Sequence, residues 1–104
     1  MKKLLYLLTL LISVSVSAQK INWMTMNEAI AAQQKAPKKI FVDVYTNWCG
    51  PCKMLDKNTF SNPDVAAYIN KHFYPVKFNG EGNELITMGD REFKNPSFDP
   101  ARTR

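Results

Sequence analysis

The chain is poor in the residues that bind metals through nitrogen and sulfur. Its 104 residues include two cysteines and a single histidine, His72. A structural zinc site takes four such ligands, so a zinc site here would require two chains to share the ion. We therefore expect no metal and no other cofactor, and an ordinary helix-surface role for His72.

Clusters of positive charge are missing as well. The sequence has 14 lysines and arginines against 9 acids, a net charge of +5, but the basic residues are spread along the chain without an arginine-rich stripe. Surfaces that follow nucleic acid concentrate lysine and arginine on one face and often interleave them with aromatic residues. The composition therefore argues against a nucleic-acid partner.

Apolar runs are short, and the one that stands out lies at the N-terminus. Lys2 and Lys3 precede the 13 residues Leu4–Val16, which carry almost no polar side chains other than serine and threonine. A bilayer-spanning helix needs about 20 apolar residues, and the small residues at the end of the run suit cleavage after Ala18. We predict a signal peptide over residues 1–18 and a periplasmic or secreted mature chain, without stable membrane association. The alternative is an uncleaved membrane anchor.

Both cysteines lie in one hexapeptide, Trp48-Cys49-Gly50-Pro51-Cys52-Lys53. Their spacing lets both sulfurs lie at the start of one helix and alternate between dithiol and disulfide with little backbone movement. The preceding Ile40–Tyr45 is rich in β-branched and aromatic residues, which predicts a buried strand leading to the pair. A purely structural disulfide is the alternative, but so short a loop constrains the unfolded chain little.

Start and stop signals place the other elements. Thr25 and Glu28 form a capping box, which predicts a helix from Met26 to about Ala36. A second helix should run from about Lys53 to Asn58 and then be interrupted. The Asn62-Pro63-Asp64 sequence predicts a third helix, Pro63–His72, and Tyr74–Phe78 reads as a second parallel strand.

The segment from Phe41 to Lys53 resembles the active-site segment of the thioredoxin superfamily. The residues that carry the resemblance are the tryptophan before the cysteines, the Gly-Pro between them, the lysine after them and Asp43 six positions ahead. Looser similarity to secreted bacterial thioredoxin-like proteins extends from Trp23 to Phe78. The resemblance implies an α/β, three-layer thioredoxin-like fold over residues 19–104. It also implies a thiol-disulfide oxidoreductase that acts on protein disulfides and receives electrons from an upstream donor.

The resemblance assigns roles to three residues. Cys49, at the exposed helix tip, is the expected nucleophile, with a pKa depressed toward the ~7 of thioredoxin-type sites. Cys52 would then resolve the mixed disulfide and form the Cys49–Cys52 disulfide. Asp43 is costly to bury as an ion, so we expect it to exchange a proton with Cys52. The alternative for Asp43 is a strand-end acid in contact with water.

The remaining residues of the hexapeptide have supporting roles. Trp48 either shields the site and offers a contact surface or only packs. Pro51 fixes the helix start, and in this family Gly50 and Pro51 between the cysteines go with reducing members. Lys53 either assists the thiolate or is an ordinary solvated helix lysine.

The C-terminal part departs from the family pattern. The full fold implied by the resemblance has four or five strands and a cis-proline loop that faces the cysteines, neither of which the late sequence predicts. Residues 79–95 read instead as a hairpin-like excursion around Gly89-Asp90. We therefore expect a fold incomplete at its C-terminus, with an unpaired edge on the second strand. A truncated product and a non-catalytic binding module are the alternatives to an enzyme.

Overall fold

The structure is a computed structural model that describes residues 19–102, so the predicted signal peptide lies outside the described residues. Helices and strands alternate along most of the chain. Their order is α2 (Met26–Lys35), β1 (Lys39–Tyr45), α3 (Gly50–Leu55), the π-helical turn η1 (Asp56–Phe60), α4 (Pro63–His72), β2 (Phe73–Asn79), β3 (Ile86–Met88) and β4 (Arg91–Phe93).

A small parallel sheet forms the centre of the fold. β1 pairs with β2 in a register that sets Asp43 opposite Lys77. On the other side of β2, the Met24 N–H donates to the Pro75 carbonyl at 2.9 Å and the Lys77 N–H donates to the Met24 carbonyl at 3.3 Å. The edge of the second strand that we expected to be unpaired is therefore bridged at one residue, Val76, and no further strand pairs with it within residues 19–102. Among the same residues, no strand pairs with the outer edge of β1 either.

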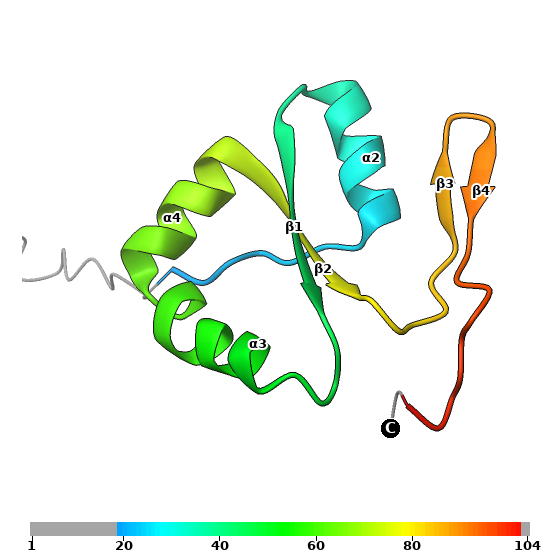
Figure 1. Ribbon diagram of the computed structural model, residues 1–104. Helices are drawn as coiled ribbons and strands as arrows, with labels where there is room; N and C mark the ends of the chain where they lie inside the picture. The colour runs from blue at the N-terminus through cyan, green and yellow to red at the C-terminus, as the bar shows by residue number, and fades with distance from the viewer. Residues whose placement is uncertain (1–18, 103–104) are drawn as a thin grey trace, which may run out of the picture.

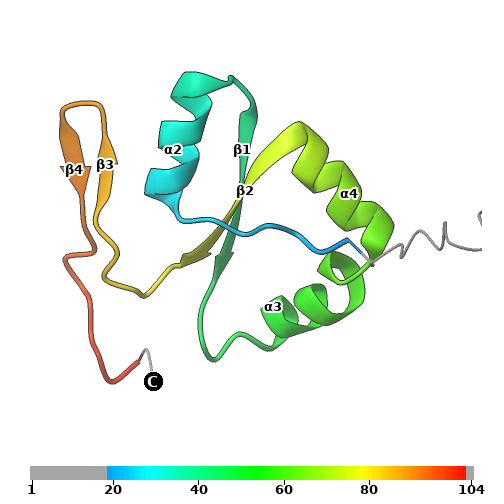
Figure 2. The same ribbon diagram turned by 180° about the vertical axis from the view of Figure 1, so that it is seen from behind.

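Helices cover both faces of this sheet. Figure 1 shows α3 and α4 on one side of β1 and β2 and α2 on the other, with the β3–β4 hairpin beyond α2. The view from behind has the same arrangement (Figure 2). The layers are those of a three-layer α/β fold with a small sheet, which confirms the predicted fold class.

An aromatic cluster joins η1, α4 and the sheet. Phe60, the last residue of η1, meets Phe41 edge-on with ring centroids 5.9 Å apart and Trp23 with centroids 5.4 Å apart. These rings pack against the buried Ile21, Ala66 and Ile69. α3 ends at Leu55, before the predicted helix end near Asn58. The chain continues as η1 because the wider turn carries Phe60 into the core.

Side-chain caps define the two longer helices. The Thr25 hydroxyl accepts a hydrogen bond from the Glu28 N–H at 3.1 Å, and the Asn62 side chain accepts one from the Asp64 N–H at 2.9 Å. Both interactions satisfy N–H groups that have no partner inside the helix. The predicted helix starts at Met26 and Pro63 are confirmed.

The hairpin is attached to α2 by one side chain. The Asn27 amide nitrogen donates to the Leu85 carbonyl at 2.8 Å, and the Asn27 amide oxygen accepts from the Thr87 N–H at 2.9 Å. Asn27 thus bonds the edge of β3 as a neighbouring strand would. Gly89, with φ of 65°, takes the first turn position, where a two-residue hairpin favours glycine.

Candidate redox site

The two cysteines form a disulfide at the N-terminus of α3. Cys49 is the N-cap residue and Cys52 lies in the first turn, with their Cα atoms 5.3 Å apart. The Cys49 Sγ also accepts a hydrogen bond from the Cys52 N–H at 3.2 Å. Pro51 occupies a first-turn position where a missing N–H costs nothing. The end of β1 and the start of α3 therefore hold both sulfurs where the helix N–H groups stabilise an anion.

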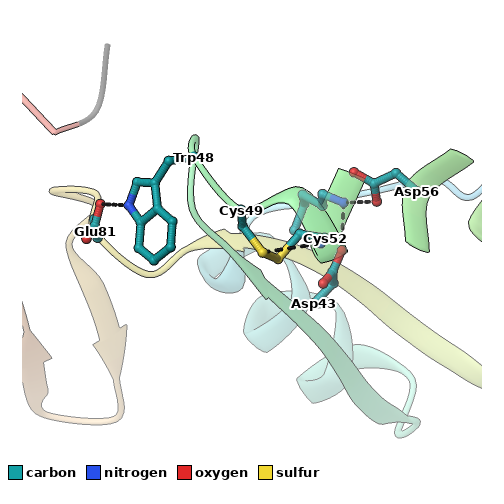
Figure 3. Close-up of a disulfide and its surroundings, with 7 residues drawn as sticks. Asp43, Trp48, Cys49, Cys52, Asp56 and Glu81 are labelled. Atoms are coloured by element: carbon teal, nitrogen blue, oxygen red, sulfur yellow. Dashed lines mark hydrogen bonds and ion pairs between the residues drawn. A yellow bond between two sulfur atoms is a disulfide. The ribbon is translucent and has the colours of Figure 1, made fainter. Parts of the chain in front are cut away.

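Trp48 projects beside the disulfide and is held from a distant loop. Its side chain is largely exposed, with 70 % relative accessibility for the residue. The indole N–H donates to the Glu81 carboxylate at 3.0 Å, and Figure 3 shows the indole between Glu81 and the cysteines. The sequence analysis missed Glu81, because only the fold brings the loop after β2 to this position.

Asp43 is buried on the α3 side of the sheet. Its side chain is 8 % exposed and accepts a hydrogen bond from the Lys77 ammonium at 2.6 Å. In Figure 3 Asp43 lies below the start of α3, on the side of Cys52. The acid is thus not a water-exposed strand end, and it is not a lone charge in an apolar strand either, because Lys77 pairs with it.

The Lys77 ammonium also forms an ion pair with a second carboxylate, that of Asp56 at the start of η1. The Lys77 ammonium also lies over the ring of Trp23, 4.9 Å from its centroid, and 5.4 Å from that of Tyr45. Burial by itself would lower the pKa of Lys77, but the hydrogen bonds and charges of the two aspartates outweigh it and raise that pKa above its ordinary value. Lys77 therefore stays protonated at neutral pH.

The sequence contains a partial signal for these partners. Asp56 follows Cys52 by four residues, so it lies one helical turn further along the same helix. Lys77 stands in a predicted strand, but the register that sets it opposite Asp43 comes only from the structure. In the sequence alone, Lys77 is one of many basic residues spread along the chain.

A hollow gives solvent access to the Cys52 side of the disulfide. Its volume is about 330 Å³, and its lining consists of Tyr45, Thr46, Asn47, Cys52, Lys53 and Asp56. Lys53 is exposed at its rim. A β-carbon built on Gly50 would contact nothing within 4 Å, so packing does not require glycine there.

Residues 19–102 contain neither a grouped set of metal ligands nor a membrane-spanning helix. No three histidine, cysteine, aspartate or glutamate side chains in that range are placed to hold a metal ion. No helix in the same range is long and apolar enough to cross a membrane.

Comparisons with known proteins point to the same chemistry. A family model described as thioredoxin-like matches residues 22–100. The thiol:disulfide interchange protein DsbD of Pectobacterium atrosepticum is 37 % identical over 46 residues, which are 44 % of this chain and 8 % of that protein. Its namesake in Citrobacter koseri is 42 % identical over 40 residues, which are 38 % of this chain and 7 % of that protein.

The match to these relatives is local, and it spans less than a tenth of their length. The family model, in contrast, covers most of this chain. Together with the Cys49–Cys52 disulfide, the comparisons support thiol-disulfide oxidoreductase chemistry. With its three-layer arrangement and a cysteine pair at the tip of α3, the chain belongs to the thioredoxin-like family.

Proposed function

We propose that this protein reduces or exchanges disulfides of exported proteins on the outer side of the cytoplasmic membrane. The observation that carries the proposal is the half-buried Cys49–Cys52 disulfide at the helix tip, with buried Asp43 on the side of Cys52. The predicted signal peptide over residues 1–18 supports the location. The similarity to interchange proteins supports protein disulfides as the substrates.

The reaction begins with reduction of the cysteine pair by a dithiol donor. The reduced Cys49, as a thiolate, attacks one sulfur of the substrate disulfide, which forms a mixed disulfide and releases the other substrate sulfur as a thiolate. Cys52 loses its proton to Asp43 and attacks Cys49. The Cys49–Cys52 bond forms, the mixed disulfide breaks, and the substrate leaves with both its sulfurs reduced.

Trp48 provides the contact surface in this proposal. An exposed aromatic ring beside the nucleophile offers apolar area to a polypeptide substrate at little entropic cost. The Glu81 hydrogen bond fixes the ring before the substrate arrives. Lys53 remains solvated and is not assigned a step.

Insulin reduction driven by dithiothreitol tests the activity. We expect the full chain to precipitate the insulin B chain faster than dithiothreitol alone, and Cys49→Ser to abolish this gain. Cys52→Ser should retain attack but trap the mixed disulfide, which a non-reducing gel detects. Lys57→Met, at an exposed position of η1, is the matched control. No acceleration together with no trapped species would reject the enzyme and favour the non-catalytic binding module.

A further inference from the structure

We propose that Asp56 is a positioning residue for the exchange reaction, one that shares Lys77 with Asp43 and thereby sets the pH range in which Cys52 resolves the mixed disulfide. The inference rests on the proposed function and assigns a residue to it. The observation behind it is a single ammonium group hydrogen-bonded to two carboxylates on two different elements.

The three side chains form a path from the interior to the surface. Asp43 is 8 % exposed, Lys77 is 23 % exposed and Asp56 is 44 % exposed. Two negative charges and one positive charge leave the cluster with a net charge of −1 next to the cysteine helix. Asp56 is the only one of the three that faces bulk solvent to a large extent, so its charge can be removed without opening the core.

Backbone hydrogen bonds of the helix link Asp56 to Cys52. The Asp56 N–H donates to the carbonyls of both Cys52 and Lys53 at the point where α3 widens into η1. Single π-helical turns of this kind are often found at functional sites. Here the wider turn is anchored by Phe60 in the aromatic cluster, and Asp56 at its start reaches Lys77.

Few other charged groups lie close enough to replace Asp56. Lys20 shares a hollow of about 320 Å³ with Asp56 and Lys77, and Lys53 shares the hollow beside Cys52. The ring of Tyr45 lies beside the Lys77 ammonium and makes a cation–π contact with it. No residue of α4 lines either hollow, so Asp56 is the acid that competes with Asp43 for Lys77.

The competition affects a defined step. When Cys52 attacks Cys49, its thiol proton must pass to a base, which the proposed function identifies as Asp43. A negative charge at Asp56 draws Lys77 away from Asp43 and disfavours further negative charge nearby. Without that charge, Lys77 pairs with Asp43 alone, and both the carboxylate and the Cys52 thiolate become easier to form.

The test is the pH dependence of turnover in the full-length chain. We expect Asp56→Asn to move the pH of half-maximal rate downward by about one unit or less. Asp56→Glu, which restores the charge, should return the profile toward wild type. Asp90→Asn removes an equal charge from the exposed hairpin turn and should leave the profile unchanged.

Two results would overturn the inference. The first is a pH profile of Asp56→Asn that superimposes on that of wild type, while Asp43→Asn shifts the profile. The second is a shift in Asp90→Asn as large as that in Asp56→Asn. A second readout, the reduction of the Cys49–Cys52 disulfide by dithiothreitol, keeps the inference separate from the proposed function. In this half-reaction a dithiothreitol thiolate attacks Cys49, breaks the Cys49–Cys52 bond and releases Cys52 as a thiolate. Trp48 fluorescence follows the rate.

The half-reaction needs no protein substrate. If wild type reduces no insulin but the half-reaction still depends on Asp56, the proposed function fails and the role of Asp56 stands. If insulin is reduced and neither profile depends on Asp56, the role of Asp56 fails and the proposed function stands.

Discussion

Trp48 and Glu81 lie 33 positions apart in the sequence, and the indole N–H of one donates to the carboxylate of the other at 3.0 Å. The bond joins the cysteine segment to the loop that follows β2. It gives an exposed ring a fixed orientation beside the disulfide, and this orientation leads to the first prediction.

Glu81→Ala should weaken substrate binding more than it slows chemistry. A hydrogen bond of this kind contributes about 0.5–1.5 kcal/mol, so we expect KM for insulin to rise about two- to tenfold with kcat nearly unchanged. Steady-state insulin reduction measures both constants. Glu92→Ala, on the exposed strand β4, is the control. A fall in kcat with constant KM would contradict a role in substrate contact.

Lys77→Met should destabilise the chain at neutral pH and much less at alkaline pH. The folded chain raises the pKa of Lys77, so its contribution is fully present below the ordinary lysine pKa of about 10.4 and disappears as the pH rises through the higher folded value. Loss of the partner of a buried carboxylate costs about 1–3 kcal/mol. Urea unfolding at pH 7, 9 and 11 tests this.

The decisive quantity in that experiment is the difference between wild type and Lys77→Met at each pH, because other lysines and tyrosines titrate in both proteins. Lys71→Met, at an exposed position of α4, should show no such pH-dependent difference. A difference that stays constant up to pH 11 would contradict the ion-pair assignment.

Phe60→Ala should lower the free energy of unfolding by about 2–4 kcal/mol, because the ring contacts both Phe41 and Trp23. Loss of Phe60 should also free η1 and raise hydrogen exchange at residues 56–60. Phe93→Ala, in the exposed hairpin, should cost less than about 1 kcal/mol. Equal costs at the two positions would show that η1 is not anchored by the cluster.

Asn27→Ala should release the hairpin without unfolding the sheet. The variant loses both hydrogen bonds to the edge of β3, so the Thr87 amide should exchange with solvent about tenfold faster or more. Amide exchange measured by NMR checks this, with Asn83→Ala as the control. Unchanged exchange at Thr87 would mean that other contacts hold the hairpin.

Local signals predicted much of the fold. The capping residues Thr25 and Asn62 gave the starts of two helices, since a cap acts within one turn of the chain. The cysteine spacing indicated the redox pair for the same reason. The hairpin around Gly89 also follows from local turn chemistry.

Features that depend on contacts between distant residues could not be predicted. Sequence cannot show that Lys77 lies opposite Asp43, because a parallel register is fixed by packing. The same holds for Glu81 and Trp48. Met54 and Leu55 of α3 are exposed although both are apolar, because η1 and not α3 supplies the aromatic contact to the core.

The Met24–Val76 bridge also sets a limit on the order of folding. These residues are 52 positions apart (76 less 24), and β2, the strand that Met24 joins, follows α2, β1, α3 and α4 in the chain. Met24 therefore has no strand to pair with until β2 has been synthesised. Closing so long a loop is slow compared with helix formation, so we expect the Met24–Val76 bridge to form after the helices that lie between its two ends in the sequence.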